Sequence, residues 1–216
     1  MFQFTRPLAA ALLLALPLMS ARAADNDELT RELLRIHNAP SGHDFAYWLP
    51  AAAFPALVPN MDAAASKAIA GAFAGYELFL VEHMSSDANG NEVASDAEPA
   101  PMHLKLASGR VLDAQRESDL TPMLLKMANA FKTVMAKDGS GKNMRIIVFK
   151  MPTLADEPRI DSPKPSVVTL LVGDVPMVWH LPLAGVGPSA VDPDSGERFP
   201  GGFAFNPYTG AALKRE

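Results

Sequence analysis

Ser166-Val-Val-Thr-Leu-Leu-Val-Gly-Asp-Val-Pro-Met-Val-Trp-His-Leu181 carries the clearest structural signal in this chain. Aliphatic and β-branched residues fill both halves of the stretch, a composition typical of strands. The Gly173-Asp174 pair between the halves favours a tight turn. The pattern therefore predicts an antiparallel hairpin made of strands 166–172 and 175–181.

Other runs rich in aliphatic and aromatic residues have the same strand-like composition. They lie at 75–84, 101–107 and 143–151. Short strands without a regular alternation of strand and helix predict an α+β fold. We expect an antiparallel sheet or β-sandwich of short strands with one packed helix, 121–136, plus a small turn-rich C-terminal appendage. An immunoglobulin-like β-sandwich is the alternative.

Three segments carry sequence signals of helices: two have a possible cap and apolar residues at helical spacing, and 62–74 is rich in alanine after a plausible cap at Asp62. They are 26–37, 62–74 and 121–136. In the last of them Thr121 is a cap, and Pro122 occupies the first turn, where its missing N–H costs nothing. The prolines of segment 43–61 predict that it holds neither a long helix nor a central strand.

Residues 1–23 have the composition of an export signal, with a positive charge at Arg6 and an apolar run over 8–19. Small residues precede the predicted cleavage site, so we expect a mature chain that starts at Ala24. The predicted location is the periplasm or the medium. Three parts follow the leader: an N-terminal helix with a proline-rich aromatic segment (24–60), a main α+β domain (61–183) and a turn-rich tail (184–216).

The chain is acidic and contains no cysteine; its net charge of −5 becomes more negative when the leader removes its two arginines. An acidic chain without a basic stripe is a poor candidate for binding nucleic acid. The lack of cysteine in this sequence excludes disulfides, thiol catalysis and Cys-ligated zinc. After the leader, no run is long and apolar enough for a membrane span, and no cofactor is predicted.

The tail contains a near-repeat, Asp192-Pro-Asp-Ser-Gly-Glu-Arg-Phe199 and Asn206-Pro-Tyr-Thr-Gly-Ala-Ala-Leu213. It resembles the paired Cys-Pro-x-Cys-Gly knuckles of zinc ribbons, with Asp192, Ser195, Asn206 and Thr209 at the four cysteine positions. Ser and Thr hydroxyls are poor zinc ligands. The resemblance implies a metal-free pair of turns, held by side-chain bonds to backbone N–H groups, in a docking module. Two unrelated turns are the alternative.

Two dipeptides, His83-Met84 and Met102-His103, form a candidate copper(I) site. If the strands that carry them pair as a hairpin, the dipeptides face each other at its open end. Thioether and imidazole ligands suit copper(I) outside the cytoplasm. Strand alternation places the imidazoles and the thioethers on opposite faces, however, so a periplasmic copper(I)-binding protein is an alternative function only.

A candidate calcium loop lies between the same strands. Asp87, Asn89, Asn91 and Glu98 have the spacing of calcium ligands in such a loop. Glu92 stands where the loop requires a glycine, and no helices are predicted on either side. A solvated acidic loop is therefore the favoured interpretation.

Sequence motifs for nucleotide binding, zinc peptidases and serine hydrolases are missing from this sequence. His43 and His180 are candidate bases for a secreted hydrolase, which is a further alternative function. In its general look the chain resembles uncharacterised secreted bacterial proteins in which a strand-rich body precedes a Trp-x-Leu-Pro-Leu segment, here 179–183. We therefore expect an exported non-enzymatic domain that binds a protein or cell-envelope partner.

The predicted binding surface comes from the aromatic cluster of segment 43–61. Large aromatic side chains are frequent anchors in interfaces, although most of them pack in protein cores. The expected anchors are Tyr47, Trp48 and Phe54.

Overall fold

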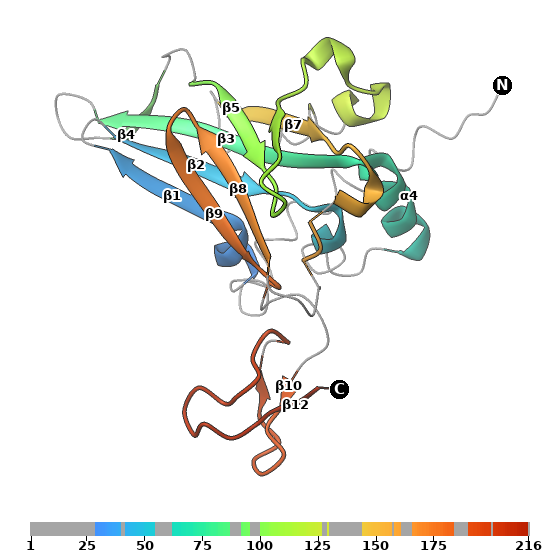
Figure 1. Ribbon diagram of the computed structural model, residues 1–216, viewed down its shortest axis with the longest axis vertical. Coiled ribbons are helices and arrows are strands. Elements are labelled where there is room, and N and C mark those ends of the chain that lie inside the picture. The colour runs from blue at the N-terminus through green and yellow to red at the C-terminus, as the bar shows by residue number, and fades with distance from the viewer. Residues whose placement is uncertain are drawn as a thin grey trace.

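A computed structural model of the chain contains two facing antiparallel sheets and a smaller tail sheet (Figure 1). The described residues are 29–39, 42–54, 62–86, 92–95, 100–126, 129, 144–156, 158–160, 166–183, 190–199 and 201–215. The predicted leader and all four calcium candidates, Asp87, Asn89, Asn91 and Glu98, lie outside these ranges. The predicted helix 121–136 is described, and helical, at 122–126 and at residue 129.

The first sheet has five strands. β2 lies between β1 and β3. The edge of β3 that faces away from β2 pairs with β7 over one part of its length and with β4 over another. The predicted strands 75–84 and 143–151 are confirmed as β3 and β7. The strands run over Leu34–Ala39 (β1), Gly42–Trp48 (β2), Tyr76–Ser86 (β3), Glu92–Ala94 (β4) and Arg145–Lys150 (β7).

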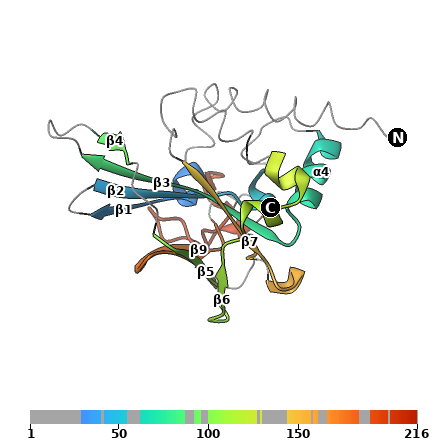
Figure 2. The ribbon, with the colours of Figure 1, turned by 90° about the horizontal axis from the view of Figure 1, so that it is seen from above.

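The second sheet has the strand order β6-β5-β8-β9. Its hairpin confirms the prediction, with β8 at Ser166–Val172 and β9 at Val175–Leu181. The predicted strand 101–107 is confirmed as β5, Met102–Lys105, while β6, Val111–Asp113, was not predicted. Figure 2 shows this sheet lying below the first one. The expected class, antiparallel sheets of short strands with few helices, is therefore confirmed.

Two predictions for the N-terminal part are wrong. The helix predicted over 26–37 ends at Leu33, and β1 begins at Leu34, where pairing with β2 outweighs local helix preference. Segment 43–61 does contain a central strand, because β2 lies between β1 and β3. The prolines of that segment all come after Trp48, so they remove no N–H group from β2.

The predicted helix 62–74 is confirmed as α4, Ala63–Phe73. The Asp62 carboxylate caps it by accepting a hydrogen bond from the N–H of Ala65 at 2.6 Å. Phe73, in its last turn, is buried and packs on Phe54 with ring centroids 5.2 Å apart. None of the helices in the described ranges has the length and apolar character needed to cross a membrane. The short 3-10 helices are η2 (Ala51–Ala53), η3 (Glu117–Asp119) and η5 (Leu154–Asp156).

Aromatic side chains form the centre of the core between the two sheets. Trp48 and Phe79 of the first sheet stack with ring centroids 6.2 Å apart. Trp179 of the second sheet lies 6.0 Å from Trp48 and 5.4 Å from Phe79. Contacts between rings from both sheets show that the sheets pack face to face as a sandwich.

The predicted binding surface is wrong, because its aromatic residues belong to this core. Trp48 is 0% exposed and Phe54 is 2% exposed, and Tyr47 packs against the same cluster. The Trp48 indole N–H donates to the buried Glu77 carboxylate at 2.7 Å, so even its polar atom is satisfied inside the protein. Trp48 and Phe54 therefore stabilise the fold and offer no surface to a partner, and Tyr47 is partly buried against them.

The tail forms a third sheet, with β10 between β11 and β12. In Figure 1 it lies below the sandwich, at the C-terminal end of the chain. Its strands are short and its turns are large, in agreement with the predicted turn-rich tail. The strands run over Ala190–Val191 (β10), Arg198–Phe199 (β11) and Lys214–Arg215 (β12).

Candidate interaction site in the C-terminal tail

The structure separates the residues of the copper prediction. His83 and Met84 lie on β3 of the first sheet, whereas Met102 and His103 lie on β5 of the second sheet. β5 pairs with β6 and β8, so the expected hairpin between β3 and β5 does not form. Within the described ranges, no three His, Asp or Glu side chains are grouped so as to hold a metal ion.

Each of these two histidines instead contacts an aspartate on a neighbouring strand. His83 Nδ1 lies 2.7 Å from Asp44 Oδ1, and His103 Nδ1 lies 2.9 Å from Asp113 Oδ1. In both cases the two residues are direct partners in the strand register. Sequence analysis missed both aspartates. Asp44 lies on a strand far along the chain from His83, and the strand that carries Asp113, β6, was not predicted. Cross-strand pairs of this kind stabilise a sheet by roughly 0.2–1 kcal/mol.

The two candidate hydrolase bases lie on different sheets. His43 is in β2 and packs edge-on against Phe45, with ring centroids 4.5 Å apart. His180 is an exposed residue of β9 that follows the buried Trp179. Because side chains alternate along a strand, His180 points away from the core that Trp179 fills. The structure does not bring the two histidines together.

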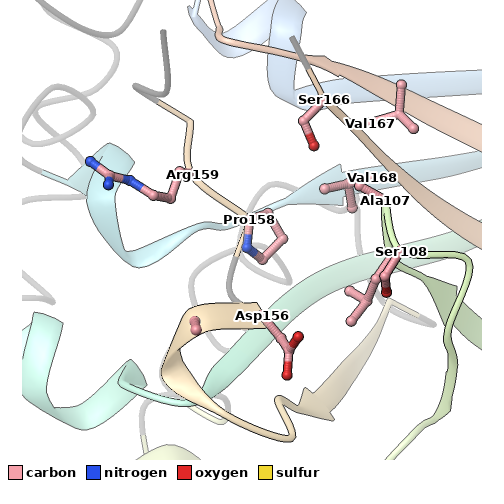
Figure 3. Close-up of a pocket in the computed structure, with 10 residues that line it drawn as sticks. Ala107, Ser108, Asp156, Pro158, Arg159, Ser166, Val167 and Val168 are labelled. Carbon is pink, nitrogen blue, oxygen red and sulfur yellow. The ribbon is translucent and has the colours of Figure 1, made fainter. Parts of the chain in front are cut away.

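A pocket of about 260 Å³ lies at one end of the second sheet, between the residues after β5, the segment around η5 and the start of β8. Figure 3 shows the Arg159 side chain extending away from Ser108, Asp156 and Ser166. Sites for small molecules usually measure about 300–1,000 Å³ and bring several polar groups together. This pocket is smaller, and its charged side chains do not converge.

The tail holds two matched turns, of which residues 192–197 form the first knuckle. Asp192 Oδ1 accepts hydrogen bonds from the backbone N–H groups of Asp194 and Ser195, at 2.9 and 3.2 Å. The Ser195 hydroxyl oxygen accepts from the N–H of Glu197 at 3.3 Å. The Asp192 carbonyl accepts from the N–H of Gly196 at 2.8 Å. Gly196 has a φ of +71°, a conformation that glycine adopts without steric cost.

Residues 206–211 form the second knuckle, which repeats these bonds one for one. Asn206 Oδ1 accepts from the N–H groups of Tyr208 and Thr209, at 2.9 and 3.3 Å. The Thr209 hydroxyl oxygen accepts from the N–H of Ala211 at 3.3 Å, and the Asn206 carbonyl accepts from Gly210 at 2.8 Å. The predicted turns, held by side-chain bonds to backbone N–H groups, are therefore confirmed. Kinship with zinc ribbons stays a prediction.

One direct side-chain contact joins the two knuckles. Asn206 Nδ2 donates to Asp192 Oδ2 at 2.5 Å, and both residues are only 3% exposed. The Asn206 amide, and after it the N–H of Asp194, hold the pKa of the Asp192 carboxyl below its usual range. A buried carboxylate is thus fully engaged by hydrogen-bond donors from both knuckles.

Acid is expected to loosen the tail. Because the pKa of Asp192 is lower in the folded chain, its contribution to stability is present above the unfolded pKa of about 3.9. That contribution is lost as the pH falls through the lower, folded pKa. The NMR signals of the Asn206 side-chain amide should report this transition, and Asp194→Asn should leave it unchanged. A tail that loosens as the pH rises from 4 to 7 would contradict this assignment.

The two knuckles have the same backbone but differ at the tip, which is Asp194 in the first and Tyr208 in the second. Tyr208 is 82% exposed, and the nearby Phe205 is 61% exposed. These are the highest exposures of any large hydrophobic side chain in the described ranges. We name Phe205 and Tyr208 the aromatic tip. Comparing the two copies of the near-repeat would have drawn attention to Tyr208, because the tip position changes from an acidic residue to a large aromatic one.

No family model, no curated protein and no solved structure matches this chain. What the protein does must therefore be inferred from the geometry of its own residues. Among the described residues, the aromatic tip holds the two most exposed large hydrophobic side chains.

Proposed function

We propose that this chain is an exported, non-enzymatic binding protein that docks a protein partner of the cell envelope through its aromatic tip. The observation that carries the proposal is the contrast between the knuckles. The first knuckle makes the same set of backbone bonds with Asp194 at its tip, so the turn does not require an aromatic residue there. At 82% exposure, most of the tyrosine side chain at that position is available to a partner.

The chemistry of the tip indicates the kind of surface that it fits. Residues 199–213 contain no charged side chain, although the first knuckle contains several. The centres of protein interfaces are poor in charge and rich in tyrosine and phenylalanine. The complementary site on the partner is therefore an apolar pocket with a hydrogen-bond acceptor for the Tyr208 hydroxyl.

The tip is also held in place before it binds. Tyr208 donates its backbone N–H to Asn206 Oδ1, and its ring packs on Phe199 with centroids 6.3 Å apart. A preorganised aromatic side chain loses little conformational entropy when it enters a pocket. The predicted leader supports the cellular location, because export would place the tail among envelope proteins.

Replacing both tip residues, Phe205→Ser with Tyr208→Ser, is expected to weaken capture of the partner at least tenfold. Truncating one central aromatic anchor typically costs about 2 kcal/mol of binding free energy, which alone is roughly thirtyfold in affinity. The measurement is quantitative cross-linking of the mature protein in envelope extract, followed by titration of the captured protein. Localisation of the full chain in fractionated cells tests export separately.

Asp194→Ser is the matched control, because it alters the same tip position of the other knuckle. It should leave capture unchanged while testing for any general effect on the tail. If the tip variant and wild type capture the same protein equally well, docking through the tip is wrong. If neither captures any envelope protein, the binding function itself is wrong.

A further inference from the structure

We propose that the Asp192–Asn206 hydrogen bond does the work of a shared metal ion, and that the two knuckles require one negative charge at their junction, on either residue. Each of these side chains uses Oδ1 for the two N–H groups of its own knuckle. That leaves Asp192 Oδ2 and Asn206 Nδ2 to meet at 2.5 Å. At this junction, Asp192 and Asn206 make the same bonds to their own knuckles. They differ in charge and in which of the two donates to the other.

The contact distance excludes an ion shared by these two atoms in this arrangement. Two ligands of one tetrahedral zinc ion, each about 2.0–2.1 Å from the metal, lie roughly 3.3 Å apart. The observed 2.5 Å is shorter than that separation, and it places the amide N–H in direct hydrogen-bond contact with the carboxylate. An exported chain without cysteine would in this way keep a paired-knuckle module that neither oxidation nor loss of metal can open.

The number of negative charges at the junction predicts how each substitution affects the stability of the knuckles. Asn206→Asp places two carboxylates in contact in a buried position, where like charges repel strongly. Exchanging the two residues, Asp192→Asn with Asn206→Asp, restores one donor facing one carboxylate. In the exchanged pair both Oδ1 atoms still accept the same backbone N–H groups. The exchange should therefore rescue the damage caused by the single substitution.

Hydrogen exchange measured by NMR on the full mature chain at pH 7 tests this. The N–H groups of Ser195 and Thr209 report the two knuckles, and that of Val168 in β8 reports the sandwich. We expect Asn206→Asp to speed exchange in both knuckles at least tenfold and to leave Val168 unchanged. In the double variant Asp192→Asn with Asn206→Asp, the hydrogen-exchange rates of the knuckles should lie within threefold of the wild-type rates. EDTA should not alter the wild-type rates.

Three results would overturn the proposal. If the knuckle N–H groups of Asn206→Asp exchange hydrogen at the wild-type rate, the junction tolerates two negative charges. If the double variant exchanges hydrogen as fast as Asn206→Asp, the two positions are not equivalent. Opening of the wild-type knuckles by EDTA would show that an ion holds them. None of these readouts depends on a docking partner, so the docking proposal and this one can fail independently.

Discussion

Replacing Trp179 with alanine is expected to lower the free energy of unfolding by about 3–5 kcal/mol, the range for a large aromatic truncated in a core. Trp179 is 0% exposed and contacts rings from the opposite sheet, Trp48 and Phe79. Its removal leaves a cavity between the two sheets, where its ring contacts those of the first sheet. We expect a chain that still folds at 25 °C but unfolds at much lower denaturant concentration.

The indole N–H of Trp179 makes a second contribution to the free energy of unfolding, which can be measured separately. It donates to the Leu33 carbonyl at 2.9 Å, just before β1 begins, and thereby joins the second sheet to the start of the first. The guanidinium of Arg35 lies over the same ring at 5.4 Å and donates to the Val178 carbonyl at 2.6 Å. Trp179→Phe keeps most of the ring contacts but leaves the Leu33 carbonyl without this donor, a loss of about 1–3 kcal/mol.

Urea denaturation followed by circular dichroism measures both variants. His180→Ala is the control, because His180 is the next residue of β9 and is exposed on the other face. Its effect should stay within about 0.5 kcal/mol. Equal destabilisation by Trp179→Ala and His180→Ala would mean that the two sheets do not pack through this ring.

The sequence predicted the elements whose information is local. The β8–β9 hairpin follows from two strand-like runs around Gly173-Asp174, and α4 follows from its cap at Asp62. The knuckles follow from residues that bond to their own backbone two and three positions on. In each case the residues that define the element also lie in contact within it.

The failures concern the pairing of one strand with another, whether the two are close in the chain or far apart. β1 has apolar spacing that also fits a helix, and only its pairing with β2 makes it a strand. The copper candidates required β3 and β5 to pair, but β5 instead pairs with β8, far along the chain. Local composition cannot rank such partners against one another.

The candidate site was only half predictable for a related reason. The near-repeat identified Asp192 and Asn206 as matched positions, yet it could not show that their side chains meet. The anchors chosen from composition, such as Trp48, were buried because a large aromatic residue gains most free energy in a core. Tyr208 is informative because it lacks that burial.

Replacing Gly42 with alanine is expected to destabilise the protein by about 3 kcal/mol. Gly42 opens β2 at a φ of +150°, and it lies directly opposite Ser85 of β3. A Cβ atom there would lie 1.9 Å from the backbone carbonyl oxygen of Met84. Because backbone atoms cannot rotate away, β2 and β3 must move apart. Overpacking of this kind costs roughly 1–3 kcal/mol, and the disfavoured φ adds about 1–2 kcal/mol.

Gly71 supplies a control within the same chain. It lies in helix α4, has an ordinary helical backbone, and a Cβ atom there would meet nothing within 4 Å. Gly71→Ala should therefore stabilise the protein by about 0.8–1 kcal/mol, since alanine is more favourable than glycine in the interior of a helix. Urea midpoints should move in opposite directions for the two Gly→Ala variants. Exchange of the Asp44 and His83 amides, further along the same strand pair, should speed up only in Gly42→Ala. If the two variants shift the midpoint alike, the close approach of β2 to β3 at Gly42 is wrong, and with it the register that pairs Asp44 with His83.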